Sequence, residues 1–218
     1  MTNCLSSLFI THYSLLIIHH SLPIIHYSLF ITHYSLLIIH YPMSLDEIVG
    51  QRYSPYAFSD KPVSEDTLYQ ILEAVRWAPS AYNEQPWRFI YALKENQEAY
   101  QQLLSCAVAD NQKWAKKAPV LLMSVAKRHF SQNGKPNRHA WHDTGMAMAF
   151  FVLKATEMGL HVHQMAGFSV EKAHERLNIP EEFSPVAMIA LGYLGDEERS
   201  DKGRKSVKEL AMPGQWRD

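Results

Sequence analysis

Two groups of residues far apart in the chain could together bind an anion. Arg52, Tyr53 and Ser54 form the first group, and Lys202 and Arg204 follow about 150 positions later. An anion with nearly two charges, such as a phosphate monoester, needs several charged donors once it leaves bulk water. The two groups therefore predict a shared phosphate site.

A proline-bracketed loop, the 79–87 loop, lies between these groups. It reads Pro79, Ser80, Ala81, Tyr82, Asn83, Glu84, Gln85, Pro86, Trp87. Its small residues, amide side chains and free backbone N–H groups suit the polar edge of a flat heterocycle. The alternative is a helix-to-strand connection rich in turn formers. We favour the binding interpretation, because so specific a run is a poor match for generic turn chemistry.

These segments, in this order, resemble the nitroreductase family of FMN-dependent oxidoreductases over about residues 46 to 215. Arg52 and Ser54 match the family's first motif, and Phe58 is in place. The resemblance implies that Arg52 binds the FMN phosphate or ribityl oxygens and that Ser54 adds a hydroxyl bond. It also implies FMN-binding roles for Tyr53 and Tyr56 in the same segment.

The resemblance places the 79–87 loop in the partner subunit's site. Pro79, Ser80, Ala81 and Asn83, with Gln85 beside them, would reach the flavin of that subunit. The homodimer would then be obligatory.

Two further segments match the family at the flavin ring. Asn111 matches a residue that the family places against the flavin. The turn Gln164, Met165, Ala166, Gly167 ends in the family's Gly-Phe pair, whose backbone amides approach flavin N5 and O4. Gly167 would allow a close approach to the ring. A tight turn after a strand is the alternative.

The sequence departs from the family pattern at three positions. Tyr56 stands where the family usually has Arg or Lys. Trp114 stands where the family has a Lys after the position of Asn111, and Ala166 stands where it has an acid before the glycine. Lys113 is a candidate replacement for the Lys absent at position 114. Less positive charge near the flavin pyrimidine edge predicts a lower reduction potential.

Lys202 and Arg204 lie in a charged run, residues 196–209, and such a run is most often a solvated face. Their position directly after the last predicted strand is where the family has basic pairs that clamp the FMN phosphate. We therefore retain both as cofactor-binding residues.

The histidines near residue 140 suggest a metal site or a catalytic dyad. The sequence shows no H-E-x-x-H spacing, and we identify no carboxylate partner for them. Trp141 and His142 are retained as substrate-pocket residues. We predict no metal and no catalytic side chain, because flavin N5 carries the chemistry.

The elements that position these residues follow from local patterns. Strands are expected at 87–93, 119–126, 160–168 and 185–194, with a long helix, apolar nearly all round, at 141–158. No G-x-G-x-x-G follows a strand and no P-loop is present. The pattern predicts a mixed α/β domain with a small sheet. The resemblance refines this to an α+β fold with a largely antiparallel sheet flanked by helices, in a dimer with a long buried helix.

Residues 1–42 form a segment of another kind. A heptad repeat begins at His12 and recurs from His19, His26 and His33, and Asp, Glu, Lys and Arg are absent before Asp46. The segment lacks a signal peptide's basic start and cleavage site, an uninterrupted membrane span, and the flanking charges of a coiled coil. Seven-residue spacing puts histidines two helical turns apart, too far for one metal ion. We interpret it as a disordered or non-native low-complexity segment, with the domain spanning 43–218.

Composition limits the possible partners and compartment. With 21 basic and 22 acidic residues and no basic stripe, nucleic acid is an unexpected partner, and no membrane partner is expected either. The two cysteines, Cys4 and Cys106, suit a reducing cytoplasm.

The resemblance implies ping-pong hydride transfer from NAD(P)H through FMN to a nitroaromatic, quinone or similar planar small-molecule acceptor. Two alternatives stay open. One is another flavin enzyme of the superfamily: a dehydrogenase, a dehalogenase or a flavin-consuming enzyme. The other is a module that binds or stores FMN without turnover.

Overall fold

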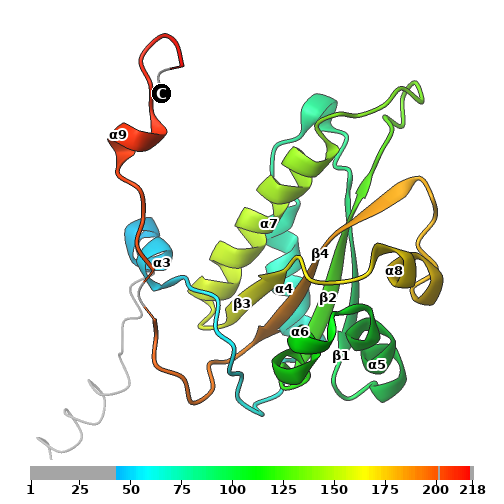
Figure 1. Ribbon diagram of the computed structural model, residues 1–218, viewed down its shortest axis with the longest axis vertical. Helices are drawn as coiled ribbons and strands as arrows, with labels where there is room; N and C mark the ends of the chain where they lie inside the picture. Colours follow the sequence, from blue (N-terminus) through cyan, green and yellow to red (C-terminus); the bar gives the residue numbers. More distant parts are fainter. Residues whose placement is uncertain (1–42, 201, 217–218) are drawn as a thin grey trace, which may run out of the picture. The chain divides into compact units, whose positions relative to one another are not determined.

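A four-stranded antiparallel sheet, in the order β1-β2-β4-β3, forms the centre of the fold (Figure 1). The computed structural model describes residues 43–200 and 202–216. The strands are β1 (Trp87–Leu93), β2 (Val120–Lys127), β3 (His161–Met165) and β4 (Phe183–Gly192). The predicted α+β class with an antiparallel sheet is confirmed.

The helices are α3 (Leu45–Gln51), α4 (Glu65–Val75), α5 (Gln97–Cys106), α6 (Ala109–Ala115), α7 (Ala140–Glu157), α8 (Val170–Arg176) and α9 (Val207–Leu210), with a 3-10 turn, η1 (Ala81–Asn83). Serine hydroxyl groups cap the N-termini of several of these helices. The Ser44 and Ser64 Oγ atoms accept from the N–H groups of Glu47 and Thr67, and Ser169 caps α8 in the same way.

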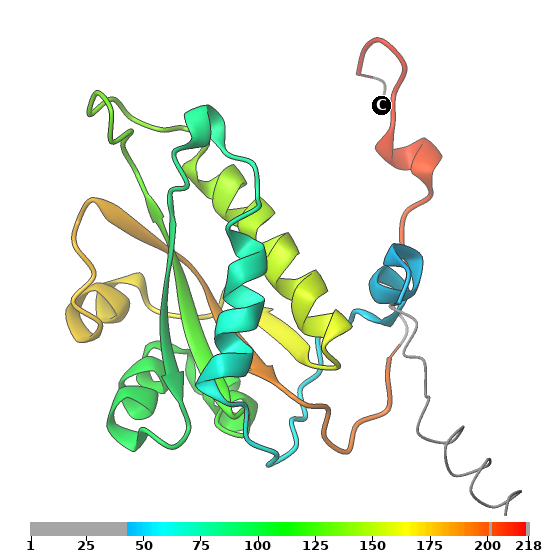
Figure 2. The ribbon, with the colours of Figure 1, turned by 180° about the vertical axis from the view of Figure 1, so that it is seen from behind.

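Helices cover both faces of the sheet. α4 and α7 pack on one face, and α5, α6 and α8 pack on the other (Figure 2). Successive β2 side chains point to opposite faces, so Leu121 and Met123 join the core under α5 while Leu122 joins the core under α7. β2 is buried along nearly its whole length, as its continuous apolar run predicts.

α7 is buried on one face only. Ala147 and Phe151 are fully buried against the sheet, whereas Trp141, Gly145 and Ala149 are exposed. A helix that is apolar nearly all round therefore leaves an apolar face uncovered in the single chain.

The chain divides into two units, Met1–Pro42 and Met43–Asp218, and every element named above belongs to the second. The predictions made for residues 1–42, including Cys4, lie outside the described residues. No helix within the described ranges is long and apolar enough to cross a bilayer. Those ranges also contain no group of three or more His, Cys, Asp or Glu side chains that could hold a metal ion.

Candidate functional site

Three arginines, Arg52, Arg199 and Arg204, lie near one another beyond the end of α3, where Arg52 is the C-cap. Partial burial lowers the pKa of Arg52, and the positive charges of Arg204 and Arg199 lower it further. Arg52 Nη1 donates to Ser54 Oγ at 3.4 Å. Within residues 43–200 and 202–216, none of the three arginines forms an ion pair. Mutually repelling guanidinium groups that form no ion pair in this part of the chain suit an anionic ligand.

The Arg204 charge thus acts on Arg52, and the assignment of both residues to one phosphate site stays a prediction. Arg199 is an addition that the sequence did not reveal. It lies in the charged run after β4, and nothing in the sequence distinguishes it from the solvated charges beside it.

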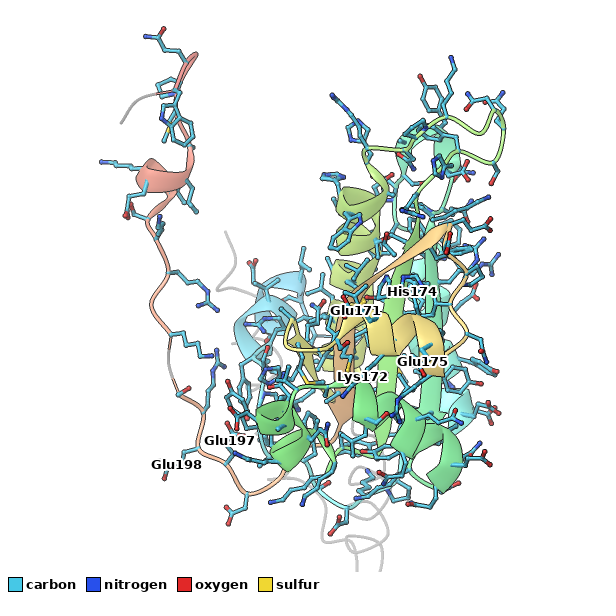
Figure 3. All side chains as sticks on the ribbon, turned by 45° about the vertical axis from the view of Figure 1, so that its right-hand side comes forward. Glu171, Lys172, His174, Glu175, Glu197 and Glu198 are labelled. Carbon is cyan, nitrogen blue, oxygen red and sulfur yellow. The ribbon has the colours of Figure 1, made fainter. Side chains whose placement is uncertain are left out.

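Glu197 fixes the start of the segment that carries these cations. Its Oε2 accepts the backbone N–H groups of Tyr56 and Ala57, each at 2.6 Å. Gly195 N–H donates to the Ala57 carbonyl oxygen at 3.1 Å. Glu197 is half-buried, whereas its neighbour Glu198 is exposed (Figure 3). The segment that follows Arg52 and the start of the charged run after β4 are therefore hydrogen-bonded to each other.

Tyr53 lies beneath this cationic group. Its ring meets His161 edge-on, with ring centroids 5.0 Å apart, and the Arg199 guanidinium lies 5.4 Å from the Tyr53 ring centroid. Tyr53 Oη and His161 Nδ1 are buried atoms without a hydrogen-bond partner in the described part of the chain. A ligand with polar groups would satisfy them, because a buried polar atom left unpaired is costly.

The two positions that lack the family's basic residues form one aromatic cluster. The His163 ring lies between Tyr56, with ring centroids 4.7 Å apart, and Trp114, at 4.4 Å. His163 Nδ1 is 2.8 Å from the Pro55 carbonyl oxygen, which can only accept, so Nδ1 carries the hydrogen. Burial lowers the pKa of His163.

Lys113, the candidate replacement for the lysine absent at position 114, forms a surface ion pair within α6. Its Nζ pairs with Asp110 at 2.5 Å in the preceding turn of α6, and its side chain is 75% exposed. Trp114, on the same helix, faces the aromatic cluster instead. Aromatic rings therefore occupy the positions at which the family has basic residues.

Asn111 and Gly167 meet across 56 positions of sequence. Asn111 Nδ2 donates to the Gly167 carbonyl oxygen at 3.0 Å, and Val108 N–H donates to the same oxygen. A Cβ on Gly167 would lie 2.7 Å from Asn111 Nδ2, so only glycine fits without displacement. The Met165 side chain is buried in the core, whereas Gln164 and Ala166 are exposed. Met165 can therefore offer a ligand only its backbone.

The 79–87 loop has an unusual backbone. Tyr82, Asn83 and Gln85 have φ values of 53°, 55° and 49°, in the left-handed backbone region that residues other than glycine seldom adopt. Ser80 Oγ accepts Gln85 N–H at 3.0 Å, and Gln85 Nε2 donates to Asn83 Oδ1 at 3.2 Å. Such strain, of order 1 kcal/mol or more per residue, persists only where surrounding contacts impose it, and it is concentrated at binding sites.

The loop is attached to the first turn of α7. Ala81 N–H donates to Asp143 Oδ2 at 2.9 Å, and Asp143 Oδ1 is 3.1 Å from His142 Nδ1. The sequence expectation that the histidines here lack a carboxylate partner is therefore wrong for His142. The partner is the next residue, because the first helical turn brings both side chains to the loop. Trp141, also predicted for the substrate pocket, is 55% exposed beside them.

The predicted residues thus fall into two groups at opposite ends of α7. The 79–87 loop, Trp141 and His142 lie at its first turn, while β3 and the Arg52 segment lie toward its last turn (Figure 2). Eighteen helical residues span about 27 Å. One flavin ring system cannot reach both groups in a single chain.

Two surface hollows of the described residues lie away from these residues. One of them, about 310 Å³, is lined by Asp60, Pro62, Val63, Leu93, Lys94, Glu95, Gln97 and Pro119. It includes none of the predicted site residues. A site with walls from two chains would give this result, because each chain presents only part of it.

Comparison with known proteins identifies the family to which this fold belongs. A family model described as "Nitroreductase family" matches residues 49–193. A crystal structure titled "oxidoreductase containing FMN" is 34% identical, with a TM-score of 0.74 over 81% of this chain and 93% of that one. A nitroreductase family protein from Streptococcus pneumoniae is 23% identical, with a TM-score of 0.68 over 78% and 99%. A curated NADH dehydrogenase from Thermus thermophilus is 28% identical over 67% of this chain and 85% of its own length. The chain belongs to the nitroreductase family.

Proposed function

We propose that the protein is an FMN-dependent oxidoreductase that takes hydride from NAD(P)H and reduces a planar acceptor such as a nitroaromatic compound or a quinone. The observation that carries the proposal is the proximity of Arg199 and Arg204 to Arg52, none of which forms an ion pair among the described residues. The 34%-identical crystal structure, whose title names FMN, supports the choice of anion.

The residues present fit FMN. Arg52, Arg199 and Arg204, with Lys202 close enough to lower the pKa of His163, supply charge for a phosphate. The orphaned Tyr53 Oη offers a polar contact beside them. Gln164 and Ala166 are exposed at the end of the edge strand β3, where their backbone is open to a ring edge.

In this proposal the side chains bind and orient FMN and the substrates, and none acts as a nucleophile. FMN, when bound, would accept hydride from the nicotinamide and pass it to the acceptor. The arginines would hold the phosphate, and the rings of Tyr56, His163 and Trp114 would present a neutral aromatic wall near the flavin. Donor and acceptor would occupy the same place in turn, which gives ping-pong kinetics.

We propose a homodimer in which each site combines the Arg52 group of one chain with the 79–87 loop of the other. The separation of the two groups along α7 supports this arrangement. Exposed apolar side chains support it as well, because a single soluble chain seldom leaves so many uncovered. They are Leu45 and Val49 of α3, Trp141 of α7, and Val207 and Leu210 of α9.

The test is anaerobic reduction of the purified protein loaded with FMN. We expect NADH or NADPH to bleach the yellow absorption, and a nitroarene or quinone to restore it. Bleaching without recovery would point to a different acceptor. No bleaching with either nucleotide would favour a module that binds FMN without turnover, and failure to bind FMN would contradict the proposal altogether.

A further inference from the structure

Asp143 is a buried carboxylate that joins two separate elements. Its side chain is only 6% exposed, and each of its oxygens has a donor. Oδ2 accepts the Ala81 N–H of the 79–87 loop at 2.9 Å, and Oδ1 is 3.1 Å from His142 Nδ1. The His142 side chain, by contrast, is 70% exposed.

This pairing fixes the orientation of the His142 ring. A carboxylate oxygen accepts, so the hydrogen lies on Nδ1 and the ring presents Nε2 on its opposite edge. A histidine held in this way can release a proton from Nε2 when protonated and regain it from solvent. An imidazole is the side chain suited to this near neutral pH.

The direct side-chain neighbours of His142 given by the structure are the Asp143 carboxylate and the His139 ring, whose centroid lies 6.3 Å from that of His142. Arg138, just before α7, donates from Nε to His139 Nε2 at 3.2 Å. From the 79–87 loop the charged side chain is Glu84, whose carboxylate accepts from Ser131 N and Oγ. Asp143 is therefore the group that holds His142 directly.

The link to Ala81 gives the pair its location. Under the proposed function, on which this inference rests, the 79–87 loop lies against the flavin of the partner chain. The Asp143 carboxylate is hydrogen-bonded both to His142 and to the loop. The His142 imidazole would therefore lie at the edge of the partner chain's flavin site.

We propose that His142 delivers the proton that completes reduction of the acceptor, and that Asp143 is the residue that positions it. For a quinone, reduced flavin supplies two electrons and one proton to the first carbonyl oxygen. The second oxygen, now an anion, takes a proton from protonated His142. An Nε2–H bond breaks, an O–H bond forms, and solvent returns the proton to His142.

The alternative is structural: the pair could simply secure the first turn of α7 to the loop. The two possibilities differ in what the His142→Gln variant should do. Since His142 is largely exposed, the variant should fold in either case. Only the proton-delivery role makes the acceptor reaction depend on an acid at this position.

The experiment compares reoxidation of the FMN-loaded, NADPH-reduced dimer by a quinone and by ferricyanide, which takes electrons without a proton. For His142→Gln we expect quinone reoxidation near pH 7 to fall on the order of 10²-fold, with ferricyanide reoxidation unchanged. In the wild type the rate of quinone reoxidation should fall as the pH rises, because the acid is lost, whereas the rate of the variant should not depend on the protonation of this position. His139→Gln, a neighbouring histidine without an ion pair in the described part of the chain, is the matched control and should keep the wild-type profile.

A second measurement needs no turnover. In ¹⁵N-histidine NMR of the full chain, the signal lost in His142→Gln should report the Nδ1–H tautomer. Asp143→Asn should change it, because an amide can accept from only one of the two donors. Equal quinone rates and pH profiles in wild type and His142→Gln would overturn the proposal. If the wild type itself fails to bind FMN or to bleach with NAD(P)H, the proposed function fails first, and the proton-delivery role fails with it.

Discussion

The Asn111 amide donates to the carbonyl oxygen of Gly167 and also occupies the space that a Cβ on Gly167 would need. The contact ties α6 to the turn after β3. A larger residue at position 167 would have to displace the Asn111 and Val108 side chains.

Gly167→Ala should therefore destabilise the protein. The new methyl group would lie 2.7 Å from Asn111 Nδ2 and 3.0 Å from Val108 Cγ2, and displacing them should cost about 1–3 kcal/mol. Urea unfolding measures this, and FMN content should fall in parallel. Gly50→Ala is the matched control, because nothing lies within 4 Å of its Cβ position and alanine favours a helix. Equal stability of the two variants would contradict the assigned role of Gly167.

Arg199→Ala and Arg204→Ala should each weaken FMN binding. Loss of one charged hydrogen bond, about 1.5–3 kcal/mol, corresponds to roughly a 10- to 100-fold weaker affinity. Binding of riboflavin, which lacks the phosphate, should change little. Fluorescence titration with both ligands measures the difference, and exposed Lys205→Ala serves as a control cation. A parallel loss of riboflavin binding would place these arginines elsewhere.

Tyr56→Arg should raise the flavin midpoint potential. A positive charge near the pyrimidine edge stabilises the reduced anion, and each 1.4 kcal/mol is worth about 30 mV for a two-electron couple. Tyr56→Phe keeps the ring against His163 and Trp114 and should leave the potential unchanged. Potentiometric titration compares the three proteins. An unchanged or lower potential in Tyr56→Arg would show that this position is remote from the pyrimidine edge.

Acid should destabilise the fold through its two half-buried histidines. Burial lowers the pKa of both His161 and His163, so the unfolded chain binds more protons than the folded one just below the ordinary histidine pKa. The stabilisation is complete above about pH 6.5 and is lost as the pH falls toward the lowered pKa values. Urea unfolding at several pH values measures the slope. His163→Gln, which keeps a donor for the Pro55 carbonyl oxygen, should reduce that slope.

Much of the fold could be predicted from local sequence signals. The apolar run of β2 implies burial on both faces, and Ser44, Ser64 and Ser169 mark helix starts because each hydroxyl satisfies a nearby N–H group. These signals act over a few residues. They require no knowledge of tertiary contacts.

The connections within the site could not be predicted in this way. Glu197 accepts backbone N–H groups from residues about 140 positions away, and no side-chain pattern marks such an acceptor. Arg199 looks like any solvated cation until the fold places it over Tyr53. Asp143 was available from sequence as the neighbour of His142, but its burial and its bond to Ala81 depend on how the loop meets α7.

The position of the two residue groups at opposite ends of α7 has a genetic consequence. Two inactive chains, one lacking Arg52 and Arg204 and the other altered in the 79–87 loop, should complement each other when they are co-expressed. Each mixed pair would contain one site with both halves intact and one with both halves defective. Random association should therefore restore about a quarter of the wild-type sites.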